Sequence, residues 1–206
     1  MVYALRGKKI TVDDILHDFK QDKKGKATYV PQLARHLQKN GLKTRVHVSS
    51  SKVVSPAWAE LEKSQLIDNL KTWLTLHSKD DWHLNNLYAL FYLEDGGELL
   101  VESYTAKTLQ DMLDRGSTLI VCVDEDWVWG HRLKRQPEDQ EVHVDELAGK
   151  LEGHFVVVTG YDGDHFHVLD PFPTNIPNRH GEYDIEVNQL TNASLTWDPQ
   201  IIEVLK

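Results

Sequence analysis

Residues 153–171 have the sequence GHFVVVTGYDGDHFHVLDP, and this stretch decides the fold. Two apolar runs rich in valine and aromatic residues flank the turn-forming tripeptide 162–164. Such runs on either side of an Asp-Gly pair are typical of an antiparallel hairpin. The segment therefore predicts two paired strands, with a histidine at the start of the first and an aspartate at the end of the second.

The register of this hairpin brings its two polar ends together. With residues 162–164 as a three-residue loop, Asp170 lies opposite Val156 and diagonally adjacent to His154, on one face of the sheet. A carboxylate that bonds an imidazole fixes the tautomer of the ring and stabilises its protonated form. We therefore predict that His154 and Asp170 form an acid–base pair.

The same register argues against a metal site. His165 and His167 fall on the opposite face from His154, so the hairpin does not gather three imidazoles. The remaining histidines show no ligand spacing, and the single cysteine, Cys122, excludes a multi-cysteine zinc cage and an internal disulfide. The sequence predicts no metal and no other cofactor.

Working outward, helical and strand periodicities alternate along the whole chain. Predicted helices cover Thr11–Phe19, Tyr29–Asn40, Trp58–Leu74, Leu84–Phe91 and Thr105–Gly116. Predicted strands cover Leu42–Val48, Leu99–Val101, Leu119–Val123, the hairpin, Glu182–Val187, and Leu195–Trp197 with Ile201–Val204, with a turn at Asn188–Asn192. Helices dominate the first half and strands the second, so we expect one α+β domain over residues 1–206 with a mostly antiparallel sheet.

Residues 125–152 differ from both halves. They are acidic and irregular, and they predict an inserted loop rather than an element of the core. Trp127 and Trp129 are its aromatic tips, and they are candidates for lining a peptide-binding groove, although tryptophans in an insert are as often packed locally.

Composition excludes several classes of protein. Acidic residues outnumber basic ones by 32 to 23, for a net charge of −9, which disfavours a binder of nucleic-acid phosphates. No apolar run is long enough to cross a bilayer, and the first residues do not resemble a secretion signal. We expect a cytoplasmic protein with no membrane partner, and composition does not indicate its oligomeric state.

A His–Asp pair needs a nucleophile, and the sequence offers none that is convincing. Cys122 lies within the apolar run Leu119–Val123, where burial disfavours the reactive thiolate, and it is interpreted as a small core residue. The serines at 49–51 have the character of a loop.

The first residues have the composition of a helix end. Good helix formers continue to Gly7, a C-cap residue, and two lysines follow, but no capping residue or acidic turn marks a beginning. Either the terminus frays, or Met1 lies inside a helix whose first turns precede this chain.

The motifs resemble those of the bacteriocin-processing (double-glycine leader) peptidases, which are papain-like cysteine peptidases. The likeness lies in residues 153–163, in Val168-x-Asp170-Pro171, and in the tail Gly181-x-Tyr183-x-Ile185…Leu190…Trp197. The front half, residues 1–48, is similar to the first helices and the strand of that family.

The resemblance implies a papain-like fold, with His154 as general base and Asp170 as its orienting carboxylate. In that family a cysteine, preceded by an oxyanion-hole glutamine, lies about two helical turns before the position of Met1. We therefore expect this chain to lack hydrolytic activity, whereas its parent would cleave peptide or protein substrates through a thioester.

Two alternatives stay open at this level. One is a non-catalytic peptide-binding domain on the same scaffold, and the other is a histidine-dependent metal hydrolase or lyase. If first-helix turns are missing, exposed apolar surface there predicts low stability or self-association.

Overall fold

The fold was analysed on a computed structural model. It describes residues 1–22, 27–135, 142–150, 152–172 and 179–206. Its helices are α1 (Val2–Leu5), α2 (Val12–Asp22), α3 (Val30–Lys39), α4 (Lys63–Leu76), α5 (His83–Glu94), α6 (Ala106–Asp114), α7 (Glu125–Trp129) and α8 (Val187–Thr196), with a 3₁₀ turn at Pro56–Trp58. Its strands are β1 (Thr44–Val48), β2 (Glu98–Val101), β3 (Thr118–Asp124), β4 (Leu133–Arg135), β5 (Val142–Val144), β6 (Gly153–Asp162), β7 (His165–Asp170), β8 (Gly181–Glu186) and β9 (Gln200–Val204).

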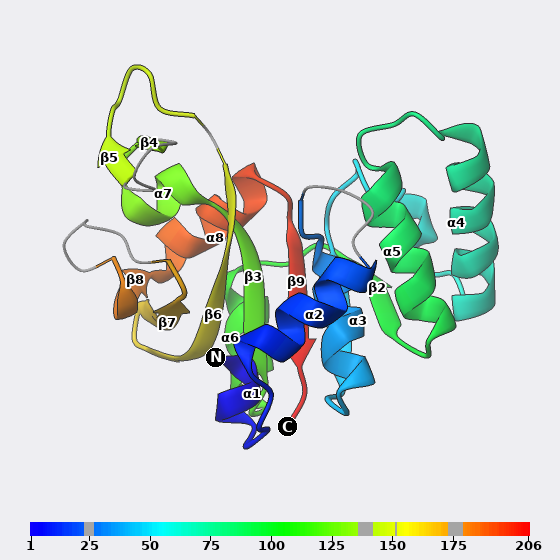
Figure 1. The fold of residues 1–206 in the computed structure, drawn as a ribbon, viewed down its shortest axis with the longest axis horizontal. Helices are drawn as coiled ribbons and strands as arrows, with labels where there is room; N and C mark the ends of the chain where they lie inside the picture. The colour runs from blue at the N-terminus through cyan, green and yellow to red at the C-terminus, as the bar shows by residue number, and fades with distance from the viewer. Residues whose placement is uncertain (23–26, 136–141, 151, 173–178) are drawn as a thin grey trace.

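Seven strands form one twisted sheet in the order β2-β1-β9-β3-β6-β7-β8 (Figure 1). Every neighbouring pair is antiparallel except β1 and β2, which are parallel. The predicted α+β class and mostly antiparallel sheet are therefore confirmed. The sheet is not confined to the second half of the chain, because β1 and β2 come from the first half.

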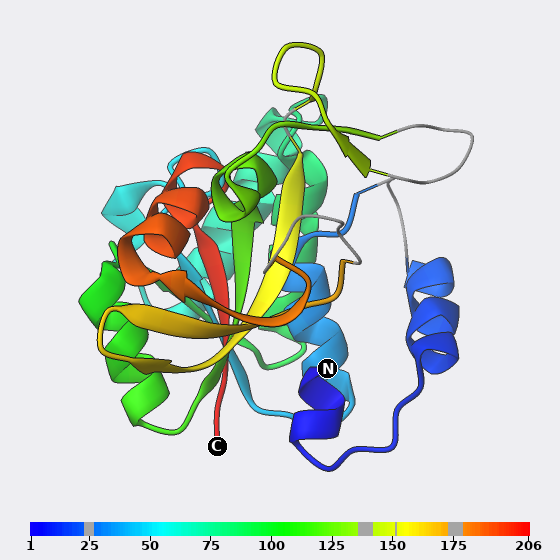
Figure 2. The ribbon, with the colours of Figure 1, turned by 90° about the vertical axis from the view of Figure 1, so that its left-hand side faces the viewer.

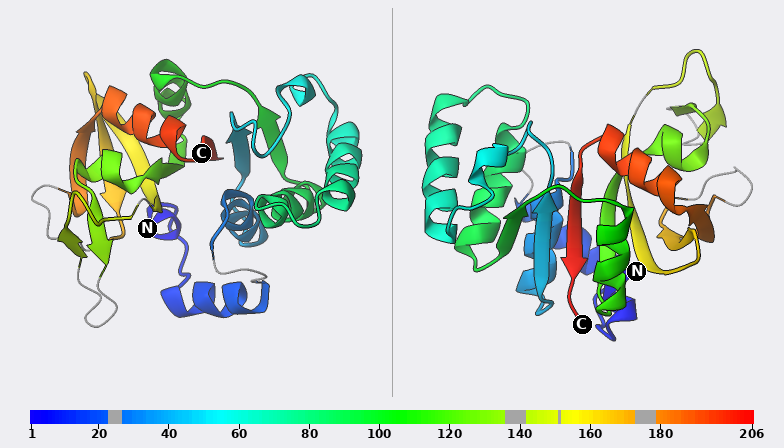
Figure 3. Two further views of the ribbon diagram at one scale, coloured as in Figure 1. Left: turned by 90° about the horizontal axis from the view of Figure 1, so that it is seen from above. Right: turned by 180° about the vertical axis from the view of Figure 1, so that it is seen from behind.

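Helices cover both faces of the sheet. Seen from above in Figure 3, α6 and α8 lie on one side and α1 and α3 on the other. Each face has its own buried cluster, because alternate residues of a strand point to opposite sides. Val156 and Val158 face the α6/α8 side, whereas Val157 and Cys122 face the α3 side. None of the helices among the described residues is both long and apolar enough to span a bilayer.

Two predictions about local structure are wrong. The segment 125–152, expected to be an irregular inserted loop, contains α7, β4 and β5 among its described residues. The expected turn at Asn188–Asn192 and strand at Leu195–Trp197 lie in α8 or directly after it. Burial of Leu190 and Ala193 against the sheet outweighs the turn propensity of the polar residues between them.

The amino-terminal segment follows the predicted signals. Thr11 and Asp14 form the expected capping box, with the Asp14 amide donating to Thr11 Oγ1 at 3.1 Å and the Thr11 amide donating to Asp14 Oδ2 at 2.9 Å. α2 lies at the periphery (Figure 2). Val12 and Leu16 on this helix, together with Met1 and Leu5, are exposed, whereas Val2 and Tyr3 of α1 are buried.

A buried carboxylate joins the sheet to its neighbours. Glu203 on β9 has no exposed surface and accepts hydrogen bonds from His47 at 3.1 Å, Ser117 at 2.8 Å and Arg115 at 3.1 Å. Burial alone would raise the pKa of Glu203, but the bonds from His47 and Ser117, with the positive charge nearby, bring it down to about 2.

Glu203→Gln is therefore expected to lower the free energy of unfolding at pH 7 by about 2 kcal/mol. Because the native pKa lies below the unfolded value, this contribution is present above about pH 4.5 and is lost as the pH falls toward 2. Urea denaturation of both proteins across this range measures the difference. The matched control is Glu98→Gln, whose exposed pair with Arg45 is expected to matter by less than about 1 kcal/mol. If the stability difference between Glu203→Gln and the parent protein does not change with pH, the ionised carboxylate of Glu203 is not the source of the stabilisation.

Candidate active site

The candidate site lies at the end of the sheet where β6 begins and β7 ends. His154 is the second residue of β6 and pairs with Val123 of β3. β6 continues through the valines 156–158, whose β-branched side chains suit a strand buried on both faces. This central position in the sheet fixes the backbone that carries His154.

The hairpin has the predicted register at its His154 end, but its loop is shorter than predicted and one strand contains a bulge. Asp162 pairs with His165, so the loop has two residues rather than the expected three, with Gly163 at φ +58°. A β-bulge between Val158 and Gly160 then shifts the register by one residue. The shorter loop and the bulge cancel, so Val158 pairs with Val168 and Val157 with Leu169, as the sequence predicts at this end.

As a result, His154 and Asp170 point to the same face and bond directly. Nε2 of His154 lies 2.7 Å from Oδ1 of Asp170. An ionised carboxylate only accepts hydrogen bonds, so the proton of a neutral ring lies on Nε2 and the lone pair on Nδ1. In the part of the chain that the structure describes, Nδ1 forms no hydrogen bond.

Asp170 is held by three further donors. Its Oδ1 accepts the backbone amide of Phe172 at 2.9 Å. Its Oδ2 accepts the indole N–H of Trp129 at 3.2 Å and the hydroxyl of Tyr183 at 2.8 Å. Burial acts to raise the pKa of Asp170, but the bond and charge of His154 and the bonds from Phe172 and Tyr183 outweigh it and hold the pKa below its usual value. The carboxylate therefore stays ionised and can stabilise a protonated imidazole.

Aromatic rings enclose the imidazole. The ring centroids of Trp129 and Phe172 lie 5.2 and 6.0 Å from that of His154. Such packing restricts the rotation of the imidazole and limits the access of water to its bond with Asp170.

The two predicted tryptophans have different positions. Trp127 on α7 is 50% exposed, in keeping with an accessible aromatic tip. Trp129 is 3% exposed and packs against the His–Asp pair, so it is not an exposed groove residue. Neither Trp129 nor Tyr183 was predicted to bond the carboxylate. The two-residue period places Tyr183 on a buried face of β8, but period alone does not reveal its partner.

Tyr183→Phe is expected to lower the free energy of unfolding by about 1.5–2 kcal/mol, because it removes one donor to a buried carboxylate and keeps the ring. Thermal and urea denaturation test this. Tyr161→Phe is the matched control, since its hydroxyl bonds the exposed Asp114 and its loss should leave the free energy of unfolding nearly unchanged. Equal losses of unfolding free energy from Tyr183→Phe and Tyr161→Phe would contradict a stabilising role for the hydrogen bond from Tyr183 to Asp170.

The only cysteine lies away from this pair. Cys122 on β3 is 5% exposed and pairs across the sheet with Phe155, on the face opposite to the His154 side chain. Burial, with the nearby Asp198 carboxylate, raises the pKa of its thiol well above the ordinary value. The prediction that Cys122 is a core residue is confirmed.

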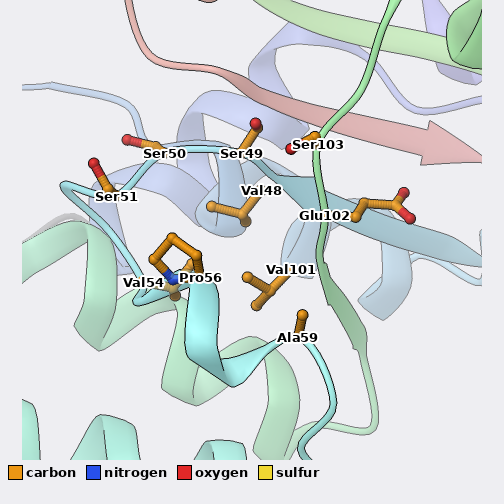
Figure 4. A pocket seen from close by; sticks show the side chains of 10 residues that line it. All are labelled: Val48, Ser49, Ser50, Ser51, Val54, Pro56, Ala59, Val101, Glu102 and Ser103. Carbon is orange, nitrogen blue, oxygen red and sulfur yellow. The ribbon is translucent and has the colours of Figure 1, made fainter.

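The serine loop supplies no nucleophile to His154 either. Ser49, Ser50 and Ser51 border a small pocket of about 160 Å³ beyond the ends of β1 and β2. Figure 4 shows valines on one side of this pocket and the hydroxyls of Ser50 and Ser51 directed away from it.

The two histidines of β7 each pair with one carboxylate. His165 bonds Asp164 and His167 bonds Asp184, on the face predicted to be opposite His154. Within the described ranges, no group of three or more His, Cys, Asp or Glu side chains is arranged to hold a metal ion.

Comparisons with known proteins add little to this geometry. No protein-family model matches the sequence, and no curated protein matches it. Among solved structures, the chain is similar to a candidate C39-like peptidase from Bacillus anthracis, with a TM-score of 0.32 and 13% identity. The match covers 50% of this chain and 48% of that one, so the chain spans about half the length of its structural neighbour.

Proposed function

We propose that this chain is a peptidase-like domain of the cysteine peptidase type, with His154 as general base and Asp170 as the carboxylate that orients it. The observation that carries the proposal is the 2.7 Å bond from Nε2 of His154 to the buried Asp170, together with an Nδ1 that no described residue hydrogen-bonds. The proposed substrate is a peptide or protein.

Under this proposal each ring nitrogen of His154 has its own role. Nε2 is held by Asp170, so Nδ1 is the atom that would take a proton from a thiol. The thiolate would attack the carbonyl carbon of an amide, and the departing amine would recover the proton from Nδ1. Water would then hydrolyse the thioester, with the same imidazole as base. Asp170, ionised throughout, would stabilise the imidazolium in both steps.

We further propose that residues 1–206 do not catalyse this reaction unaided. Cys122 is buried on the other face of the sheet, and its raised thiol pKa opposes formation of a thiolate. A reacting thiol would therefore have to come from outside these residues.

The test compares residues 1–206 with the product of the complete reading frame that encodes them. We expect no labelling of residues 1–206 by an electrophilic cysteine probe and no thiol-dependent peptide hydrolysis. The complete product should show both, and His154→Ala should abolish its hydrolysis. Thiol-dependent hydrolysis that survives His154→Ala would overturn the proposal.

One observation favours a second function, peptide binding without catalysis. The described residues bring no thiol to His154, yet they leave Trp127 half exposed on the helix whose Trp129 packs against the site. If neither protein is labelled or hydrolyses peptides, and peptide binding is unchanged in His154→Ala but weakened by Trp127→Ala, this second function is the correct one.

A further inference from the structure

A cavity lies at the end of the sheet where β6 begins, on the face of β6 opposite to the His154 side chain. Its volume is about 710 Å³, within the range of small-molecule sites. Four aromatic side chains line it: Tyr29, Trp82, Phe155 and Trp197. Asn85, Cys122 and Asp198 also border the space. The walls therefore combine four aromatic rings with several polar and acidic groups.

One buried acceptor atom at this cavity has no partner among the described residues. Asp198 is 6% exposed, and its Oδ2 accepts from the side-chain amide of Gln200, while Ser50 also donates to its carboxylate. Its Oδ1 bonds nothing among the described residues. A buried acceptor left unpaired costs about 1–3 kcal/mol, so this oxygen calls for a ligand that donates.

The surroundings select a positive charge. Asp81 and Glu152 also line the cavity, so an anion would be repelled. The ring of Trp82 can attract a cation, since Nζ of Lys52 lies 5.7 Å from its centroid, and the charge of Lys52 also acts on Asp198. Guanidinium and ammonium groups carry only donors, which match the unpaired carboxylate oxygen of Asp198.

We propose that this cavity binds an organic cation, a guanidinium or alkylammonium group, held between the aromatic walls and bonded by Asp198. The site does not involve His154 and does not depend on the proposed function. Burial acts to raise the pKa of Asp198, so affinity for the cation should fall as the pH is lowered through that pKa.

Isothermal titration calorimetry with N-acetylarginine amide tests the proposal, and N-acetylcitrulline amide, which has the same shape and no charge, is the matched ligand. We expect binding of the arginine compound and at least tenfold weaker binding of the citrulline compound. Asp198→Asn should weaken arginine binding at least tenfold. Asp81→Asn, which removes an exposed carboxylate from the same cavity, should change it less than threefold.

Two further titrations complete the test. Butylammonium titrated in the same way separates ammonium from guanidinium, and binding of either supports the site. His154→Ala should leave the affinity for the arginine compound unchanged, which separates this result from the fate of the proposed function. No binding at millimolar ligand, or equal binding of both amides, would overturn the inference.

Discussion

Asp170→Ala is expected to lower the free energy of unfolding at pH 7 by about 3–5 kcal/mol, because it leaves several buried donors without an acceptor. His154, Trp129, Tyr183 and the Phe172 amide all bond this one carboxylate. Urea denaturation measures the loss. Asp170→Asn should cost less, about 2 kcal/mol, since its oxygen can still accept from His154 and Phe172. Its amide nitrogen would face the indole N–H of Trp129, and both are donors.

The pH dependence follows from the direction of the pKa shift. The native pKa of Asp170 lies below its ordinary value, so the ionised carboxylate stabilises the fold above the unfolded pKa, and this stabilisation is lost as the pH falls through the native value. The difference between Asp170→Asn and the parent should therefore shrink in acid.

The same hairpin offers a matched control. Asp184 bonds His167 at 2.6 Å on the outer face, where both side chains are exposed. Asp184→Ala should cost less than about 1 kcal/mol. Equal losses from Asp170→Ala and Asp184→Ala would show that burial does not distinguish the candidate catalytic pair from a surface pair.

Gly153→Ala is expected to destabilise the protein by about 3 kcal/mol, through steric overlap. A Cβ atom at position 153 would lie 2.0 Å from Nε1 and 2.4 Å from Cε2 of the Trp197 indole. The indole is a rigid wall of the cation cavity, so it cannot give way without disturbing Asp198 beside it. Thermal denaturation and calorimetric titration with N-acetylarginine amide should both report the change.

Gly160 in the same strand is the control. Its added Cβ would meet only Cδ2 of His167, at 3.4 Å, so Gly160→Ala should change stability by less than about 1 kcal/mol. In a Trp197→Leu background the cost of Gly153→Ala should fall, because the smaller side chain leaves room. A cost unchanged by Trp197→Leu would show that the indole is not what excludes a side chain at position 153.

The pairing of His154 with Asp170 could be predicted because it depends on local rules. Alternation along two strands assigns faces, and the Asp-Gly turn assigns the partners. The predicted loop was one residue too long, and the bulge near Thr159 restored the register. A bulge of this kind has no clear signal in the sequence. The predicted pairing at the His154 end is therefore correct because the overlong loop and the missing bulge compensate for each other.

Other features required the packed chain. The turn residues near Asn188 gave no sign of α8, because the helix is stabilised by burying Leu190 on the sheet. Nor did the composition of residues 125–152 indicate that Trp129 would be buried and bonded to a carboxylate 41 residues away. Local propensity cannot report contacts between distant segments.

The sequence by itself determined the class of the fold, the two faces of the hairpin, and the burial of Cys122, since all three follow from the spacing and polarity of neighbouring residues. Only the tertiary structure decided which side chains donate hydrogen bonds to Asp170, and that one carboxylate oxygen of Asp198 has no donor among the described residues. The physical reason is that hydrogen bonds of buried groups are made between elements far apart in the chain, and their geometry exists only once the sheet and its helices have packed.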